Sequence, residues 1–135
     1  MQNYYLNEKL VIMILGLALL GGCKQPTKNP DKGVSFELNQ QRKQALSEIS
    51  YQLQLDIPAD KFTPINGKIV IAVNINSLSN NLIIDFNEDA TNLSKIQIEG
   101  KEIPYTFINE HIVIDPKYLK TGLNVVVIDF IAGDL

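Results

Sequence analysis

Cysteine and histidine, side chains often used in nucleophilic catalysis and zinc binding, are scarce in this chain. The 135-residue sequence holds one cysteine, Cys23, and one histidine, His111. A lone histidine cannot build a multi-histidine metal site, and no serine or cysteine accompanies it in a recognisable nucleophile motif. We therefore expect His111 to cap a turn between two strands, with a functional role as the less favoured alternative.

The densest acidic group is formed by Asp85, Glu88 and Asp89 in the stretch IIDFNEDA. Carboxylates are the ligands that calcium prefers, but the spacing does not match the calcium loop D-x-[DN]-x-[DN]-G, and Ala90 stands where the glycine belongs. A solvated turn is therefore favoured over a calcium site. Motifs of the type H-E-x-x-H or G-x-S-x-G are absent from the sequence. The sequence predicts no catalytic residue, no metal ligand and no cofactor in this chain.

Cys23 follows an apolar run, LVIMILGLALLGG, at residues 10–22. With about thirteen residues, the run is shorter than the roughly twenty that span a bilayer, and its length is typical of a secretory signal. Leu20-Gly21-Gly22-Cys23 resembles the lipobox of bacterial lipoproteins, in which the signal is cut before the cysteine and the cysteine is acylated. The resemblance implies cleavage between Gly22 and Cys23 and lipid attachment at Cys23. A membrane helix with a chance cysteine and an ordinary cleaved signal remain alternatives.

A lipid anchor at Cys23 would place the mature chain in a bacterial cell envelope, at either the inner or the outer membrane. Two or more acyl chains, at about 0.8 kcal/mol per buried methylene, hold a protein stably on a membrane. Residues 1–22 contain one Glu and one Lys, so the formal net charge of −3 is the same after their removal. This mildly acidic charge predicts no nucleic-acid partner. A single cysteine also allows no disulfide within the chain.

The composition divides the chain into three segments: a signal peptide at 1–22, a flexible tether at 23–34 and a β-rich domain at 35–135. The tether begins with Cys23 and continues as KQPTKNPDKG, which is polar and contains two prolines. The length of the remaining chain fits one domain with a modest core.

The domain begins with a helical pattern and continues as strands. The stretch SFELNQQRKQALSEIS predicts a helix with Ser35 as its N-cap and Glu37 in its first turn. Its narrow apolar stripe is expected to pack on the edge of the domain, and consists of Leu38, Ala45, Leu46 and Ile49.

From Tyr51 the hydrophobic period changes from 3.6 to 2, which predicts a half-buried strand that ends at Pro58. Residues 64–67 are expected to form a turn, and Gly100 and Lys101 a hairpin turn. The nearly continuous apolar run at 125–130 predicts burial on both faces. Seven short strands favour a mainly β fold, an antiparallel sandwich or curved sheet with one short N-terminal helix. They are expected at 51–57, 69–75, 82–86, 95–99, 103–108, 111–114 and 125–130.

The domain resembles the N-terminal region of bacterial aminopeptidase-N-like zinc metallopeptidases, the gluzincin aminopeptidases. In GVSFELNQQRKQALSEISYQLQLDIPAD a helix with an Arg-Lys pair leads into a strand that ends in Ile-Pro. Gly67-Lys68, LIIDF, IQIEGKEIPYTFINEHIVID and YLKTGLNVVVIDFIAGDL then keep the order of that family. The pattern L-x-x-G-x-N-x-V-x-I-x-F is matched by Leu119, Gly122, Asn124, Val126, Ile128 and Phe130.

The resemblance runs from Gly33 to Leu135 and implies a saddle-shaped β-domain that precedes a thermolysin-like catalytic domain. Zinc and its H-E-x-x-H ligands belong to that second domain, and G-x-M-E-N grips the free amine of the substrate. Because this sequence has neither motif, the resemblance implies a non-catalytic and incomplete N-terminal domain. Its partners would be a catalytic domain and a peptide substrate, whose N-terminal residue the intact enzyme removes.

A different class of function also fits the sequence. A self-contained β-sandwich lipoprotein of the envelope would bind a glycan, a peptide or a protein partner. Tyr105, Phe107 and Tyr118 could then form an aromatic binding surface, although packing in the core is the favoured role for these rings.

Overall fold

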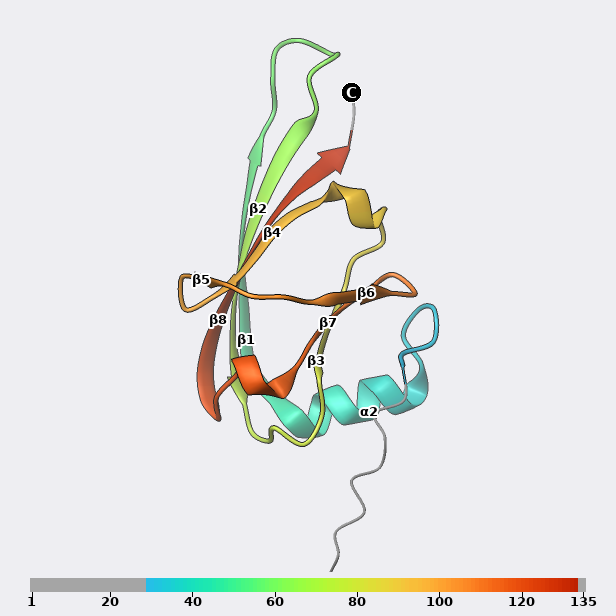
Figure 1. Ribbon diagram of the computed structural model, residues 1–135, viewed down its shortest axis with the longest axis vertical. Coiled ribbons are helices and arrows are strands. Elements are labelled where there is room, and N and C mark those ends of the chain that lie inside the picture. Colours follow the sequence, from blue (N-terminus) through green and yellow to red (C-terminus); the bar gives the residue numbers. More distant parts are fainter. Residues whose placement is uncertain (1–28, 134–135) are drawn as a thin grey trace, which may run out of the picture.

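The computed structural model describes residues 29–133, which form two antiparallel β-sheets and one short α-helix (Figure 1). The larger sheet has five strands in the order β1-β2-β8-β4-β5, and the smaller has three in the order β3-β7-β6. The prediction of a mainly β, antiparallel fold with a short N-terminal helix is therefore confirmed. The elements are α2 (Phe36–Ala45), β1 (Leu46–Asp56), β2 (Ile65–Ile75), β3 (Leu82–Asp85), the 3₁₀ turn η1 (Ala90–Asn92), β4 (Leu93–Ile98), β5 (Lys101–Glu102), β6 (Thr106–Ile108), β7 (His111–Ile114), η2 (Pro116–Tyr118) and β8 (Gly122–Gly133).

The helix α2 begins where the sequence predicts but ends five residues early. Ser35 is its N-cap, and the Ser35 hydroxyl oxygen accepts a hydrogen bond from the backbone N–H of Leu38 at 3.1 Å. The predicted continuation to Ser50 is wrong, because Leu46 already pairs with Ile75 of β2. Pairing with a distant strand thus outweighs the local helical preference. In α2 the expected apolar stripe buries only Leu38.

The hairpin of β1 and β2 departs from the expected pattern in two ways. Ile65, Asn66 and Gly67, expected in a turn, lie in β2 and pair with β8, and Asn66 and Gly67 also pair with β1. The predicted half-burial of β1 is also wrong, because its side chains are exposed from Glu48 to Asp56. The alternation predicts one apolar face correctly, but in the described structure no layer covers that face over β1.

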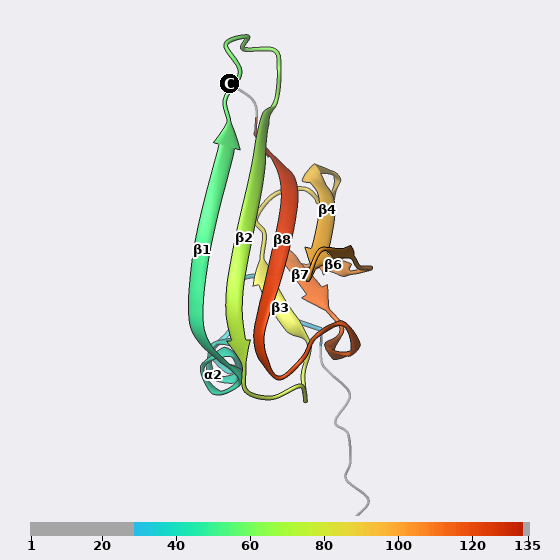
Figure 2. The ribbon, with the colours of Figure 1, turned by 90° about the vertical axis from the view of Figure 1, so that its left-hand side faces the viewer.

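The strand β8 lies in the middle of the five-stranded sheet, between β2 and β4 (Figure 2). Asn124, Val126 and Ile128 on one face are buried to 2% exposure or less. Val125 and Val127 on the other face are only half-buried. The predicted burial on both faces is therefore wrong, because the described chain packs its second sheet on one face alone.

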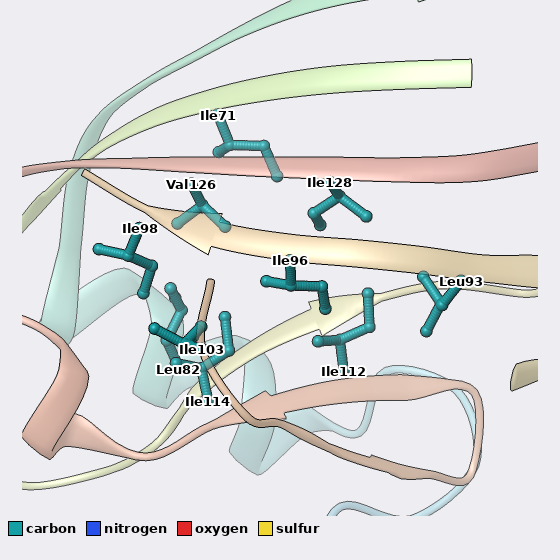
Figure 3. Packing of buried hydrophobic residues seen from close by; sticks show 10 residues of the cluster. All are labelled: Ile71, Leu82, Leu93, Ile96, Ile98, Ile103, Ile112, Ile114, Val126 and Ile128. Carbon is teal, nitrogen blue, oxygen red and sulfur yellow. The ribbon is translucent and has the colours of Figure 1, made fainter. Parts of the chain in front are cut away.

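The core lies between the two sheets (Figure 3). Ile96 and Ile98 of β4 and Val126 of β8 face Ile112 and Ile114 of β7, and each is at most 4% exposed. At about 25 cal/mol per Å² of apolar surface removed from water, such burial is the main favourable contribution to folding. β-branched side chains predominate in this core and suit pleated strands, on which they pack well.

The connection between β4 and β7 contains more turns than expected. The predicted strand at 103–108 is shorter in the structure, because residues 103–105 form no strand and only Thr106–Ile108 forms β6. The hairpin partner of β4 is the two-residue β5, after a turn at Glu99 and Gly100 that has positive φ at both residues. The structure thus has eight strands where seven were expected. No helix among residues 29–133 has the length and apolar character to span a membrane.

Candidate functional site

An apolar groove opens between the two sheets at the α2 end of the molecule. Its volume is about 310 Å³, near the lower limit of ordinary small-molecule pockets. Side chains from both sheets line it, and Arg42 and Asp85 are its charged residues. The apolar part of the lining is Leu46, Ile49, Tyr51, Ile69, Ile71, Val73, Leu82, Ile83, Ile84, Phe86, Ile112, Ile128 and Phe130.

Arg42 of α2 joins the helix to the small sheet at the rim of the groove. Its two terminal nitrogens donate to the two carboxylate oxygens of Asp85 at 3.0 and 2.5 Å, and Nη2 also donates to the backbone carbonyl of Ile83 at 3.1 Å. This is the two-pronged geometry in which guanidinium and carboxylate groups bind best. Because these bonds occupy the Arg42 guanidinium, we assign it to holding α2 in place.

Arg42 also affects the ionisation of Asp85. Its hydrogen bonds hold the pKa of the Asp85 carboxyl below the usual range, and partial burial opposes this by raising that pKa. The charges of Arg42 and His111 contribute further lowering. The carboxylate thus stays ionised beside two groups that face it.

His111 begins β7 and is almost fully buried, with 1% of its surface exposed. Its Nε2 lies 3.0 Å from the carbonyl oxygens of both Asp31 and Gly33. Because carbonyl oxygens only accept, Nε2 must carry the hydrogen of these contacts. Nδ1 lies 2.9 Å from an Asp85 carboxylate oxygen but has no well-directed hydrogen bond within the described residues.

The expectation that His111 caps a turn is therefore wrong. The side chain instead attaches the segment before α2 to the small sheet. Two neighbours strengthen this attachment, since Asn109 donates to the carbonyl of Pro30 at 2.9 Å and Lys32 lies 2.6 Å from Glu110. Within the expected tether at 23–34, residues 30–33 are thus held against the domain.

The acidic group is divided among separate structural roles. Asp85 pairs with Arg42, whereas Asp89 caps η1 by accepting a hydrogen bond from the backbone N–H of Thr91 at 2.8 Å. No group of three or more His, Cys, Asp or Glu side chains in residues 29–133 is arranged to hold a metal ion. Cys23 and Gly22, the expected lipid attachment and cleavage residues, lie outside the described residues.

Of the three candidate aromatic residues, Tyr105 and Tyr118 line one shallow hollow, and Phe107 lies outside it. Tyr105, Phe107 and Tyr118 are each partly buried against the core. Phe107 makes an edge-to-face contact with Phe86, at 6.2 Å between ring centroids. Packing, the favoured alternative, describes them correctly.

The Arg42–Asp85 pair and the groove beside it were not predicted from the sequence. The two residues stand 43 positions apart, and no periodicity or motif spacing relates side chains at that distance.

We predict that Asp85→Asn destabilises the protein at neutral pH and has little effect in acid. The folded-state pKa of Asp85 is lowered, so its contribution to stability is full above the unfolded-state pKa and is lost as the pH falls through the folded-state pKa. Urea unfolding of the variant and the wild type should give free energies that converge only as the pH falls below about 4, the unfolded-state pKa of an aspartate. A difference that is constant with pH would contradict the role assigned to Asp85, and Glu102→Gln on the exposed β5 serves as control.

We also predict that His111→Leu releases residues 30–33. An unsatisfied buried hydrogen-bonding group costs about 1–3 kcal/mol, so trypsin cleavage after Lys32 should accelerate about tenfold or more. His111→Gln keeps a hydrogen-bond donor, so its rate of cleavage after Lys32 should lie between those of the wild type and His111→Leu. Glu110→Gln removes only the partly exposed ion pair with Lys32. Mass spectrometry of the fragments separates local release from unfolding, which would also cut after Lys68 in β2. Unchanged cleavage after Lys32 in His111→Leu would contradict the attachment.

Comparison of the chain with protein-family models, curated proteins and solved structures found no match.

Proposed function

We propose that this chain is a membrane-attached, non-catalytic β-domain of the zinc-aminopeptidase type, which shapes the active-site cleft of a separate catalytic domain. The observation that carries the proposal is that residues on which the resemblance rests make structural contacts within the fold. They are spread over most of the domain and hold together the elements of one two-sheet fold.

Asn124, in the pattern L-x-x-G-x-N-x-V-x-I-x-F, is completely buried. Its amide nitrogen donates to the carbonyls of Lys120 and Gly122 at 2.7 and 2.9 Å, and its oxygen accepts from the N–H of Lys120 at 3.0 Å. Gly122 has φ of +90°, which favours glycine. These residues fix the turn that leads into β8. Their contacts support the interpretation that the pattern specifies structure rather than catalysis.

Gly67 and Phe130 provide a second example. A Cβ atom at Gly67 would lie 2.5 Å from the Phe130 ring, so glycine allows the ring to lie across β2. The Arg42 of the Arg-Lys pair ties α2 to Asp85 in LIIDF. The Gly67–Phe130 and Arg42–Asp85 contacts join four of the quoted motifs in two pairs, and these contacts support the resemblance.

The attachment around His111 supports a positioning role. Residues 30–33 are bound to the domain immediately after the segment expected to lead from the lipidated Cys23. A short tether would keep the domain, and a catalytic domain bound to it, close to the membrane.

The catalytic part of the proposal is tested by activity and by the coding DNA. The full chain should not hydrolyse aminoacyl nitroanilides, with or without added zinc, because zinc and its ligands would belong to the separate domain. Reading beyond the codon for Leu135 should reveal H-E-x-x-H and G-x-M-E-N, in the same frame or a nearby one. Zinc-dependent hydrolysis by this chain, or unrelated sequence downstream, would overturn the proposal.

The anchor is tested by Cys23→Ser in the full chain, produced in bacteria that receive radiolabelled palmitate. The wild type should carry the label and sediment with membranes, whereas the variant should lose the label because it lacks the acceptor thiol. Lys24→Ser, next to the site, should keep it. Equal labelling of wild type and Cys23→Ser would rule out Cys23 as the lipid attachment residue.

The groove favours a second candidate, a self-contained envelope lipoprotein that binds an apolar ligand or peptide side chain. Its lining is almost entirely apolar, and it opens beside Tyr51 of the uncovered β1. Unrelated sequence after Leu135, together with saturable binding of an apolar fluorescent probe that Tyr51→Lys weakens, would favour this function.

A further inference from the structure

The two edges of the five-stranded sheet differ in their protection against pairing with another chain. At one edge, β5 has only two residues, Lys101 and Glu102, and both are charged. At the other edge, β1 extends over eleven residues and, among residues 29–133, pairs only with β2 (Figure 2). Natural proteins protect edges with short strands, lysines, prolines or inward-pointing charges. The stretch 50–56 of β1 has none of these on its apolar face.

A row of exposed apolar side chains lies on this unprotected strand. Tyr51, Leu53 and Leu55 are 66%, 57% and 45% exposed. They pair with Ile71, Ile69 and Gly67 of β2, so they share the face on which the core is built. A contiguous exposed apolar surface of this kind is typical of an interaction site.

We propose that β1 pairs antiparallel with β1 of a second copy of this chain, about a twofold axis at Leu53. The two five-stranded sheets would then form one continuous sheet across the dimer. The inference concerns the edge of the sheet and does not depend on the relationship to peptidases.

The sequence of β1 is self-complementary in this register. Leu53 meets its own copy, Tyr51 meets Leu55, Gln52 meets Gln54, and Ser50 meets Asp56. Each apolar side chain therefore faces an apolar one, as the side-chain period of two requires. No like charges come opposite each other in the paired stretch.

Neighbouring registers are less favourable. With the axis at Gln52, the ladder would run into the bulge after Ser47, and Asp56 would come near the acidic Glu48. With the axis at Gln54, the ladder would shorten to residues 52–56, because β1 ends at Asp56. An isologous contact of this kind closes as a dimer. The self-complementarity is the reason for choosing a second copy over a foreign peptide as occupant.

Cysteine pairing across the axis tests both the contact and its register. Only the residue on the axis meets itself, at a Cα separation of about 4.5–5.5 Å, which a disulfide can bridge. In the full chain with Cys23→Ser, Leu53→Cys should cross-link to twice the chain mass under mild oxidation. Gln52→Cys and Gln54→Cys should not. Cross-linking through residue 52 or 54, or at none of the three, would overturn the proposal.

Oligomeric state without cross-linking provides the second measurement. The wild-type full chain in detergent should sediment as a dimer, and Leu53→Lys, which opposes two lysines at the axis, should sediment as a monomer. Leu123→Lys is the matched control, because Leu123 of β8 is 56% exposed and lies away from β1. It should remain dimeric. A wild-type monomer, an open-ended series of oligomers, or a dimer that Leu53→Lys leaves intact would contradict the inference, and circular dichroism verifies that Leu53→Lys is folded.

Discussion

The insertion of β8 between β2 and β4 is the constraint on which the rest of the structure depends. β8 is the last strand of residues 29–133, yet it pairs with β2 along its full length and with most of β4. Without β8, the β1–β2 hairpin and the β4–β5 hairpin would share no hydrogen bonds. The five-stranded sheet therefore forms only when residues far apart in the chain have been brought together, at a cost in loop-closure entropy.

The same strand also forms part of one side of the core. Val126 and Ile128 face the small sheet, and the buried isoleucines of β7 pack onto them. The small sheet is narrower than the large one, so it covers β8 and β4 but leaves the apolar face of β1 exposed. The groove lies at the boundary between the covered and uncovered parts. The groove thus arises from a mismatch between the widths of the two layers.

Two polar contacts complete this arrangement from outside the sheets. Arg42 ties α2 to the small sheet through Asp85, and His111 ties the segment before α2 to the start of β7. Asp85 lies between the two, within reach of both side chains. The Arg42–Asp85 pair is charge-assisted and partly exposed, so it fixes geometry more than it adds stability. Their position holds residues 30–33 and the start of α2 against the small sheet.

The sequence alone determined the features that depend on near neighbours: the N-cap at Ser35, the limits of β7 and the mainly β character all follow from hydrogen bonds and side-chain periods that act over a few residues. It did not reveal where α2 ends, what His111 binds or that β1 is uncovered. Pairing with Ile75 of β2 places Leu46 in a strand. The carbonyls of Asp31 and Gly33 belong to residues about 80 positions from the histidine that binds them. The alternation along β1 predicts an apolar face, but only the tertiary structure decides whether another layer covers it, because burial depends on segments that are distant in the chain.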